Sequence, residues 1–307
     1  VDENNRYLVT RYSFTYLTSG RDLLRLKEKI KSKQTATVIA NPNYGAFETA
    51  AVDRGLLIGK GSNKATQTAS GGRMDISRIY FGPLPATQEE AQTLKRLFPH
   101  SVVLTKGEAT ETALKQVNSP VILHIATHGF FLEDVQVKPA ADSGRGLLIS
   151  NLQPDQFPRP LGRIENPLLR SGLGFAGANL KSKRDDDGIL TAAEASGLNL
   201  WGTKLVVLSA CDTGVGEVKN SEGVYGLRRA LVLAGSETQV MSLWPVSDTG
   251  TRDLMIGYYK GLKAGLGRSA ALRDVQLRML ASRNWSHPYF WASFIQSGEW
   301  ANLNGRR

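Results

Sequence analysis

The chain has 307 residues, enough for one large domain or two smaller ones, and 41% of them are hydrophobic, as in an ordinary soluble globular protein. It contains no apolar stretch of the roughly 18 to 20 residues that span a bilayer, and its start lacks a signal-peptide pattern, so we expect a cytoplasmic protein with no membrane partner. The 38 basic and 28 acidic residues give a net charge of +10. The Lys and Arg are scattered and match no nucleic-acid motif, which argues against a nucleic-acid partner.

Cysteine use places a further limit on the fold. Cys211 is the only cysteine, and one thiol cannot form an internal disulfide. The fold is therefore not a disulfide framework, and the residue is compatible with a reducing compartment. The sequence begins without an initiator Met and with residues that already resemble folded structure, from which we expect more chain upstream.

The order of apolar runs predicts the organisation of the chain. Residues 1–35 are expected to form an N-terminal extension or edge elements, with a strand at 6–17 and a helix at 19–32 that Ser19 caps. From 36 to 303, strands and helices alternate, which predicts an α/β domain whose mostly parallel sheet is covered on both faces. We expect strands at 35–42, 101–107, 121–129, 204–211, 238–246 and 289–298, and helices at 86–98, 109–117, 222–235, 248–265 and 267–282.

One segment interrupts this alternation. Residues 132–187 are rich in Gly and Pro and include the charged turn KSKRDDDG. We expect a loop-rich insertion of short strands between two strands of the sheet. Insertions of this kind commonly border an active site.

Two reactive side chains are expected where strands of the sheet end. His128 follows one apolar run and precedes Gly129, and Cys211 follows another and precedes a turn of sequence DTG. Parallel sheets present ligands and reacting groups at the carboxyl ends of their strands. Alone, Cys211 is better explained as a buried packing residue, because free cysteine behaves as a small hydrophobe. An imidazole in an equivalent position favours a nucleophile, since a thiol of ordinary pKa needs such a neighbour to become a thiolate.

The segments HIATHG (124–129) and LSACDTG (208–214) together resemble the caspase-like cysteine peptidases. Within them the chain is most similar to the CHAT domain, a clan CD relative of caspases and separase that is often attached to tetratricopeptide repeats in bacteria. The resemblance runs from about residue 5 to 303 and includes 187–214, 222–244 and 287–300. It implies a three-layer α/β/α sandwich. It also implies hydrolysis of a peptide bond in a protein substrate, with His128 and Cys211 as the catalytic pair.

The resemblance also implies a mechanism of acyl transfer. Cys211 attacks the scissile carbonyl, and His128 organises the proton transfers and protonates the leaving amine. The backbone amides of Gly129 and Cys211 are the expected oxyanion donors. The sequence does not assign a third residue that orients the imidazole.

Departures from the caspase pattern bear on specificity. The caspase signature is Gln-Ala-Cys-x-Gly, whereas Ser209 stands here in place of the Gln and Gly214 comes one place later, so a preference for Asp at the cleaved bond is not expected. The stretch SLWPVSD (242–248) is similar to one in separase whose last acidic residue lines the pocket for a basic side chain. This carries over to Asp248, and we place Asp212 with it among the substrate-binding residues. Cleavage after Arg or Lys is the prediction. The alternative is that Asp248 caps the helix that begins there, and the residue can do both.

Three parts of the sequence partly match motifs for metal or cofactor binding, but the residues around them do not complete those motifs. His124 precedes His128 by four residues and shares its face of a strand, but no third ligand is indicated, so a role in the core is favoured over a metal site. GLGFAG (172–177) fits a dinucleotide pattern, yet no helix follows it. The segment 183–194 has acidic residues at some positions of a calcium loop but none at the first ligand position. Thr191 is expected to cap a short helix instead. We therefore expect neither a metal nor a cofactor.

Two functional hypotheses follow. The first is a cysteine endopeptidase. The second is a catalytically silent caspase-like module that acts as a partner-binding signalling domain, since a fold does not by itself secure activity. In either case the expected partners are proteins, namely a substrate and upstream tetratricopeptide repeats or a regulatory protein.

Overall fold

The computed structural model describes most of the chain, and all that follows concerns the residues that it describes. These are residues 1–28, 30–45, 56–58, 79–131, 167–182, 186–209, 222–244 and 246–306.

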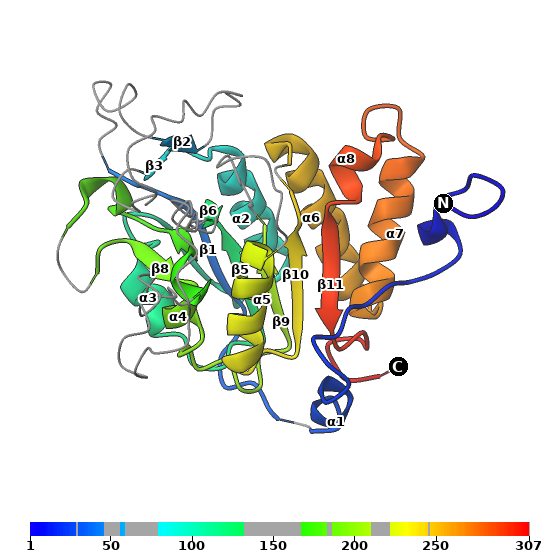
Figure 1. The fold of residues 1–307 in the computed structure, drawn as a ribbon, viewed down its shortest axis with the longest axis horizontal. Helices are drawn as coiled ribbons and strands as arrows, with labels where there is room; N and C mark the ends of the chain where they lie inside the picture. The colour runs from blue at the N-terminus through cyan, green and yellow to red at the C-terminus, as the bar shows by residue number, and fades with distance from the viewer. Residues whose placement is uncertain are drawn as a thin grey trace, which may run out of the picture.

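A six-stranded sheet forms the centre of the molecule, in the order β11-β10-β9-β5-β1-β4 (Figure 1). Its strands are β1 (Thr37–Pro42), β4 (Val102–Lys106), β5 (Ile122–Ala126), β9 (Leu205–Leu208), β10 (Thr238–Ser242) and β11 (Phe294–Gly298). Strand β11 runs antiparallel to β10, and the other neighbouring pairs are parallel. The predicted α/β class with a mostly parallel sheet is confirmed.

The central strands β5 and β9 are mainly apolar because helices cover both of their faces. Every residue of β5 and of β9 is buried. Alternate side chains point to opposite faces of a strand, so a strand buried on both faces has a nearly continuous apolar sequence. Ile125 of β5 pairs with Ile39 of β1 on one side and with Leu208 of β9 on the other.

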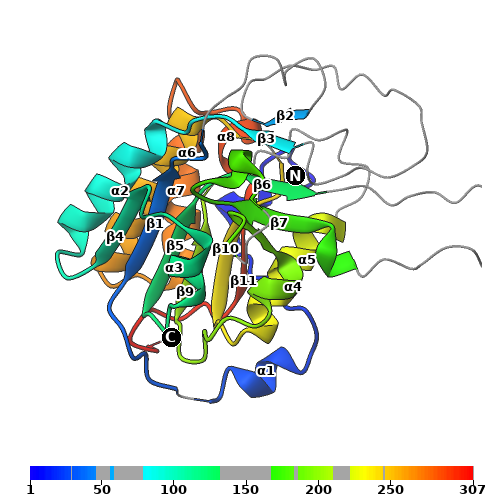
Figure 2. The same ribbon diagram turned by 90° about the vertical axis from the view of Figure 1, so that its left-hand side faces the viewer.

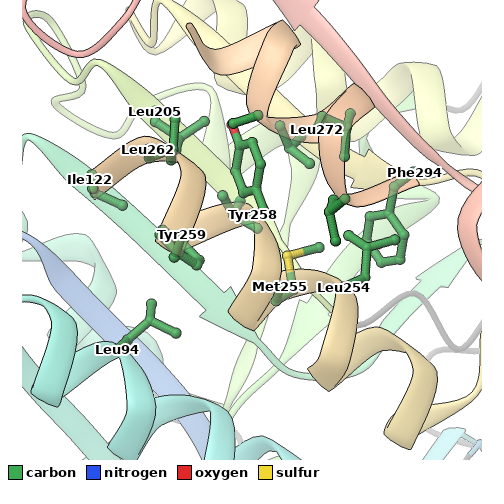
Figure 3. Close-up of a cluster of buried hydrophobic side chains, with 14 of the residues drawn as sticks. Leu94, Ile122, Leu205, Leu254, Met255, Tyr258, Tyr259, Leu262, Leu272 and Phe294 are labelled. Atoms are coloured by element: carbon green, nitrogen blue, oxygen red, sulfur yellow. The ribbon is translucent and has the colours of Figure 1, made fainter. Parts of the chain in front are cut away.

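Two layers of helices enclose the sheet (Figure 2). On one face lie α2 (Ala86–Leu97), α6 (Asp248–Lys263) and α7 (Arg268–Leu280), and on the other lie α3 (Glu111–Lys115), α4 (Ala192–Ala195) and α5 (Glu222–Leu233). The larger hydrophobic cluster lies between the sheet and the first of these layers, where Tyr258, Tyr259 and Met255 of α6 pack toward Ile122 and Leu205 (Figure 3). The three-layer sandwich is thus formed by a core on each face of the sheet.

Short strands lie beyond the carboxyl edge of the sheet. Strand β3 (Ile79–Phe81) pairs with β2 (Leu56–Ile58), and a separate sheet contains β6 (Gly129–Phe131), β7 (Ser171–Gly174) and β8 (Ile189–Thr191). Figure 2 shows β3 and β6 above the ends of β1 and β5. These strands therefore surround the edge at which the sequence predicts reactive residues.

The N-terminal extension differs from its prediction. The expected strand at 6–17 contains a 3-10 helix, η1 (Leu8–Thr10), and one bridge from Tyr16 to Ser297 of β11, and the expected helix shrinks to α1 (Asp22–Arg25). Ser19 does not cap this helix: the Asp22 carboxylate accepts from the backbone amide of Ser19. Tertiary contacts override helix propensity after α1, where Lys204 donates to the carbonyl of Ile30.

Other predicted elements agree more closely, with two qualifications. The expected last strand begins instead as the short helix α8 (Pro288–Trp291), and β11 follows it. Residues 132–166 and 183–185 of the predicted insertion lie outside the described residues. Thr191 caps α4 as predicted. In the described part of the chain, no helix combines the length and apolar character needed to cross a bilayer.

Candidate functional site

The carboxyl edge of the sheet contains a switch point between β1 and β5. From β1 the chain proceeds to β4 on one side and then to β5 on the other. In open α/β sheets the crevice at such a point is where ligands bind. Tyr44 follows β1 and His128 follows β5, and their ring centroids are 5.4 Å apart. The structure thus places the predicted catalytic histidine where the topology favours a site.

His128 is fully buried, and its ring is held from several sides. The Phe81 ring stacks on it at a centroid distance of 6.0 Å, and Nε2 lies 2.8 Å from the carbonyl oxygen of Gly82. A carbonyl only accepts hydrogen bonds, so Nε2 must carry the proton and donate it. We therefore assign the neutral tautomer in which Nδ1 is the basic nitrogen.

The electrostatic environment keeps this imidazole neutral. Burial lowers the pKa of His128 from 6.5 to about 4, and the hydrogen bond to Gly82 opposes this shift only in part. At neutral pH the ring is thus uncharged and not a cation. An imidazole in this state can accept a proton from a thiol, provided that the conjugate acid is stabilised as the reaction proceeds.

The backbone of His128 is held by a chain of hydroxyl groups. Its amide donates to the Tyr44 hydroxyl at 3.2 Å, and that hydroxyl lies 2.8 Å from Oγ1 of Thr127. Thr127 in turn donates to the carbonyl of Gly174 in β7. These bonds connect the end of β1, the end of β5 and the small sheet, so the position of His128 depends on all three.

The amide of Gly129 does not take part in the ladder between β6 and β7. The amide of Gly174 donates to the carbonyl of His128 at 2.9 Å, and the next pair in the antiparallel register is Gly129 with Leu173. Hydrogen-bonded and non-bonded pairs alternate along such a ladder, so the Gly129 amide points away from β7. Gly129 itself is buried.

Cys211 and Asp212 lie outside the described residues, as does the predicted amide donor at Cys211. The described chain ends at Ser209, just after β9, and resumes at Glu222. The Ser209 amide donates to the carbonyl of Ile125 at 2.9 Å. The strand that leads to the predicted nucleophile therefore lies directly beside the strand that leads to His128.

A buried polar cluster lies beneath these two strand ends. We call it the Glu90 cluster, and its members are Glu90, His124, Ser209 and Tyr259. Ser209 Oγ donates to both carboxylate oxygens of Glu90, at 2.7 and 2.9 Å, and Nε2 of His124 lies 3.0 Å from Glu90 Oε1. The Tyr259 hydroxyl lies 2.9 Å from Nδ1 of His124. The core role predicted for His124 is confirmed, and in the described part of the chain no group of acidic, His or Cys side chains is arranged to hold a metal.

Asp248 occupies the first turn of α6, and Ser247 is the capping residue, since its hydroxyl accepts from the amide of Gly250. The alternative role of Asp248 as the cap is therefore wrong. Burial of its carboxyl group, and secondarily the negative charge of Glu90, raise the pKa of Asp248, although solvent still reaches the residue. The charge of Glu90 thus acts on the residue that was predicted to bind a basic side chain.

Sequence reasoning missed three contributors to this site. The Gly82 carbonyl is a backbone group, so no residue type in the sequence indicates its role. Tyr44 follows a strand end, where no motif in the sequence marks it. For Glu90 a signal existed, because Thr87 and Leu94, three residues before it and four after it, share its helix face and both are buried, which marks Glu90 as an inward-facing acid.

Comparisons with known proteins give a matching family model and two similar proteins. The family model described as CHAT domain matches residues 1–299. The chain is similar to Tetratricopeptide repeat protein 28 of Homo sapiens, at 27% identity over 311 residues, which cover 98% of this chain and 11% of that protein. It is also similar to the protein of the same name of Mus musculus, at 27% identity over 235 residues, which cover 75% of this chain and 9% of that protein. The chain spans about a tenth of the length of these relatives.

Proposed function

Because this chain belongs to the CHAT domain family, a family of caspase-like fold, we propose that it is a cysteine endopeptidase in which Cys211 and His128 form the catalytic dyad. The observation that carries the proposal is the state of His128. Its ring is buried at the switch point of the sheet, and its Nε2 proton is engaged by the Gly82 carbonyl. Ligands and reacting groups are bound at the carboxyl edge of a parallel sheet. An imidazole held there with Nδ1 unprotonated is suited to act as a base, which a histidine that only fills the core does not require.

The proposed reaction proceeds by acyl transfer. Nδ1 of His128 takes the thiol proton of Cys211, and the sulfur attacks the scissile carbonyl carbon as the carbonyl electron pair moves to oxygen. The Gly129 amide, which points away from β7, donates to that oxyanion. When the intermediate collapses, the carbon–nitrogen bond breaks and His128 protonates the departing amine. Water then hydrolyses the thioester, and His128 accepts its proton.

The Gly82 carbonyl supplies the orienting group that the sequence does not assign. While Nε2 donates to it, the ring cannot rotate without losing that hydrogen bond, which keeps Nδ1 in one direction. The bond also favours the protonated ring that forms during catalysis, because Nε2 remains a donor in that state.

Specificity for Arg or Lys at the cleaved bond is part of the proposal. Asp248 begins α6, its carboxylate is reached by solvent, and Glu90 adds a second negative charge close enough to shift its pKa. A basic side chain bound there would be stabilised by Asp248, and its positive charge would relieve the repulsion between the two acids.

A catalytically silent, partner-binding module is the second candidate. It is favoured by the name of the matched relatives, which describes repeats and not a peptidase. The proposed partner is either a set of upstream tetratricopeptide repeats or a regulatory protein.

A labelling experiment separates the two candidates. An acyloxymethyl ketone peptide that ends in Arg is incubated with the protein, and the intact mass reports one adduct, which must lie on Cys211 if the thiol reacts because the chain has one cysteine. We expect stoichiometric labelling that His128→Ala abolishes and that His100→Ala, at an exposed histidine, leaves unchanged. Labelling that is absent, or indifferent to His128, would favour the silent module.

A further inference from the structure

The Glu90 cluster connects the two strands that carry the proposed catalytic residues. His124 belongs to β5, four residues before His128, and Ser209 follows β9, two residues before Cys211. Glu90, from α2, contacts both. One carboxylate thus links the two strand ends from below, on the face of the sheet that α2 and α6 cover.

The cluster is unfavourable as packing alone. Glu90 and His124 are at most 1% exposed, in a layer whose other members are mainly Ala, Leu, Val and aromatic residues. A buried carboxylate loses its hydration, and a buried ion pair is often no more stable than apolar side chains of the same volume. Packing by itself therefore does not explain an acid at position 90.

The contacts of the cluster come from four elements. The Ser209 hydroxyl donates to Glu90, and Nε2 of His124 lies 3.0 Å from Glu90 Oε1 without forming a hydrogen bond. The Tyr259 hydroxyl lies 2.9 Å from Nδ1 of His124. Two helices and two strands are therefore joined through one set of buried polar contacts, which tends to enforce a single arrangement.

The main-chain ladder alone does not set the approach of a nucleophile to its base. The bond from the Ser209 amide to Ile125 fixes the separation of β5 and β9, but the Ser209 side chain is directed by Glu90. Reactions between positioned groups are sensitive to displacements of about 1 Å, which can change rates roughly a hundredfold.

We infer that Glu90 is a positioning residue, which holds the strand end before Cys211 against the strand that carries His128 and so sets the contact between thiol and imidazole. This rests on the proposed dyad. Glu90 acts through Ser209 and His124 and does not touch the substrate.

Alkylation of Cys211 by iodoacetamide tests this inference without a substrate. The chain has one cysteine, so the intact mass follows its rate of modification directly. The quantity of interest is the ratio of the alkylation rate with His128 present to the rate in His128→Gln. We expect a ratio of about ten at neutral pH in the unmodified chain, as the imidazole assists thiolate formation.

Four variants determine whether this ratio depends on the cluster. For Glu90→Leu and for Ser209→Ala, the alkylation rate is measured with His128 present and again in combination with His128→Gln. We expect the ratio of the two rates to fall toward one in both variants. Glu90→Gln keeps the shape and an oxygen that accepts from Ser209, and it should retain most of the ratio. Glu89→Leu is the matched control, because Glu89 is adjacent, exposed and paired with Arg252 across the same two helices; it should leave the ratio unchanged. Circular dichroism confirms folding of each variant.

The outcomes are distinguishable. A ratio of about ten that persists in folded Glu90→Leu or Ser209→Ala overturns the positioning role and leaves the dyad intact. An equal loss in Glu90→Gln and Glu90→Leu also overturns it, because the link to Ser209 would then be irrelevant. A ratio of one in the unmodified chain overturns the dyad itself and the inference with it. Ser209→Ala removes one hydroxyl only, so it decides the question even where Glu90→Leu does not fold.

Discussion

Nε2 of His128 lies 2.8 Å from the carbonyl oxygen of Gly82, and this hydrogen bond determines which nitrogen of the ring is basic. The two residues lie far apart in the sequence, just after β5 and just after β3. Their contact depends on the position of β3 over the carboxyl edge of the sheet (Figure 2). The proposed role of His128 as a base therefore depends on a hydrogen bond to a backbone oxygen.

Stability should depend on pH through His128. Its pKa is about 4 in the folded chain and 6.5 when unfolded, so between these values the unfolded chain binds a proton that the folded chain does not. The free energy of unfolding should fall as pH decreases from 6.5 to 4, by about 3 kcal/mol from this residue, with no further loss below that range. Urea unfolding of the unmodified chain and of His128→Gln measures it. A variant that loses stability as steeply as the unmodified chain over this range would contradict the assignment.

Tyr44→Phe should destabilise the end of β1 and the backbone of His128. The change removes a hydroxyl that accepts from the His128 amide and bonds with Thr127, while the ring that stacks on Phe81 remains. We expect a loss of about 1 kcal/mol in the free energy of unfolding, the usual size of a buried hydrogen bond. Tyr12→Phe, at an exposed tyrosine, is the control and should be neutral. No difference between the two variants would show that the hydroxyl chain does not hold His128.

Asp248→Asn should reduce cleavage after Arg if the proposed specificity is correct. We expect kcat/KM for an Arg peptide to fall at least about tenfold relative to a norleucine peptide, since a charge-assisted hydrogen bond contributes roughly 1.5 to 3 kcal/mol. Asp253→Asn, in the same helix, is the control. Because the pKa of Asp248 is raised, the preference of the unmodified chain for Arg should weaken, as pH falls, at a higher pH than for an ordinary Asp. A preference that survives Asp248→Asn would remove Asp248 from the pocket.

Thr191→Ala should affect stability without affecting the site. Thr191 accepts from the amide of Glu194, whose carboxylate accepts in turn from the Thr191 amide, and this capping box begins α4. Loss of the cap should lower the free energy of unfolding by about 1 kcal/mol. Thr191→Ser should retain it. The rate at which iodoacetamide modifies Cys211 should be equal in all three proteins well below their melting temperatures, and a change there would reveal an unexpected connection to the site.

Elements that depend on local sequence patterns agree with their predictions, whereas elements held by contacts with distant segments do not. Strands β5, β9 and β10 and helices α2, α6 and α7 agree with their predicted segments because buried parallel strands and amphipathic helices have strong local patterns. The N-terminal extension does not agree with its predicted helix. Helix α1 ends at Arg25, and the following chain is held by contacts such as the hydrogen bond from Ser32 to the carbonyl of Gly202. The catalytic assignments of His128 and Cys211, and the roles of Gly129, Asp212 and Asp248, stay predictions.

By itself, the sequence determined the alternation of strands and helices and the order in which His128 and Cys211 follow apolar runs, because both depend on neighbouring residues. Only the tertiary structure decided the protonation of His128, the direction of the Gly129 amide and the partners of Glu90. Those properties depend on atoms from distant segments, including a carbonyl that any residue carries. Such contacts arise when the sheet and its two helical layers close around the core, and no local pattern encodes them.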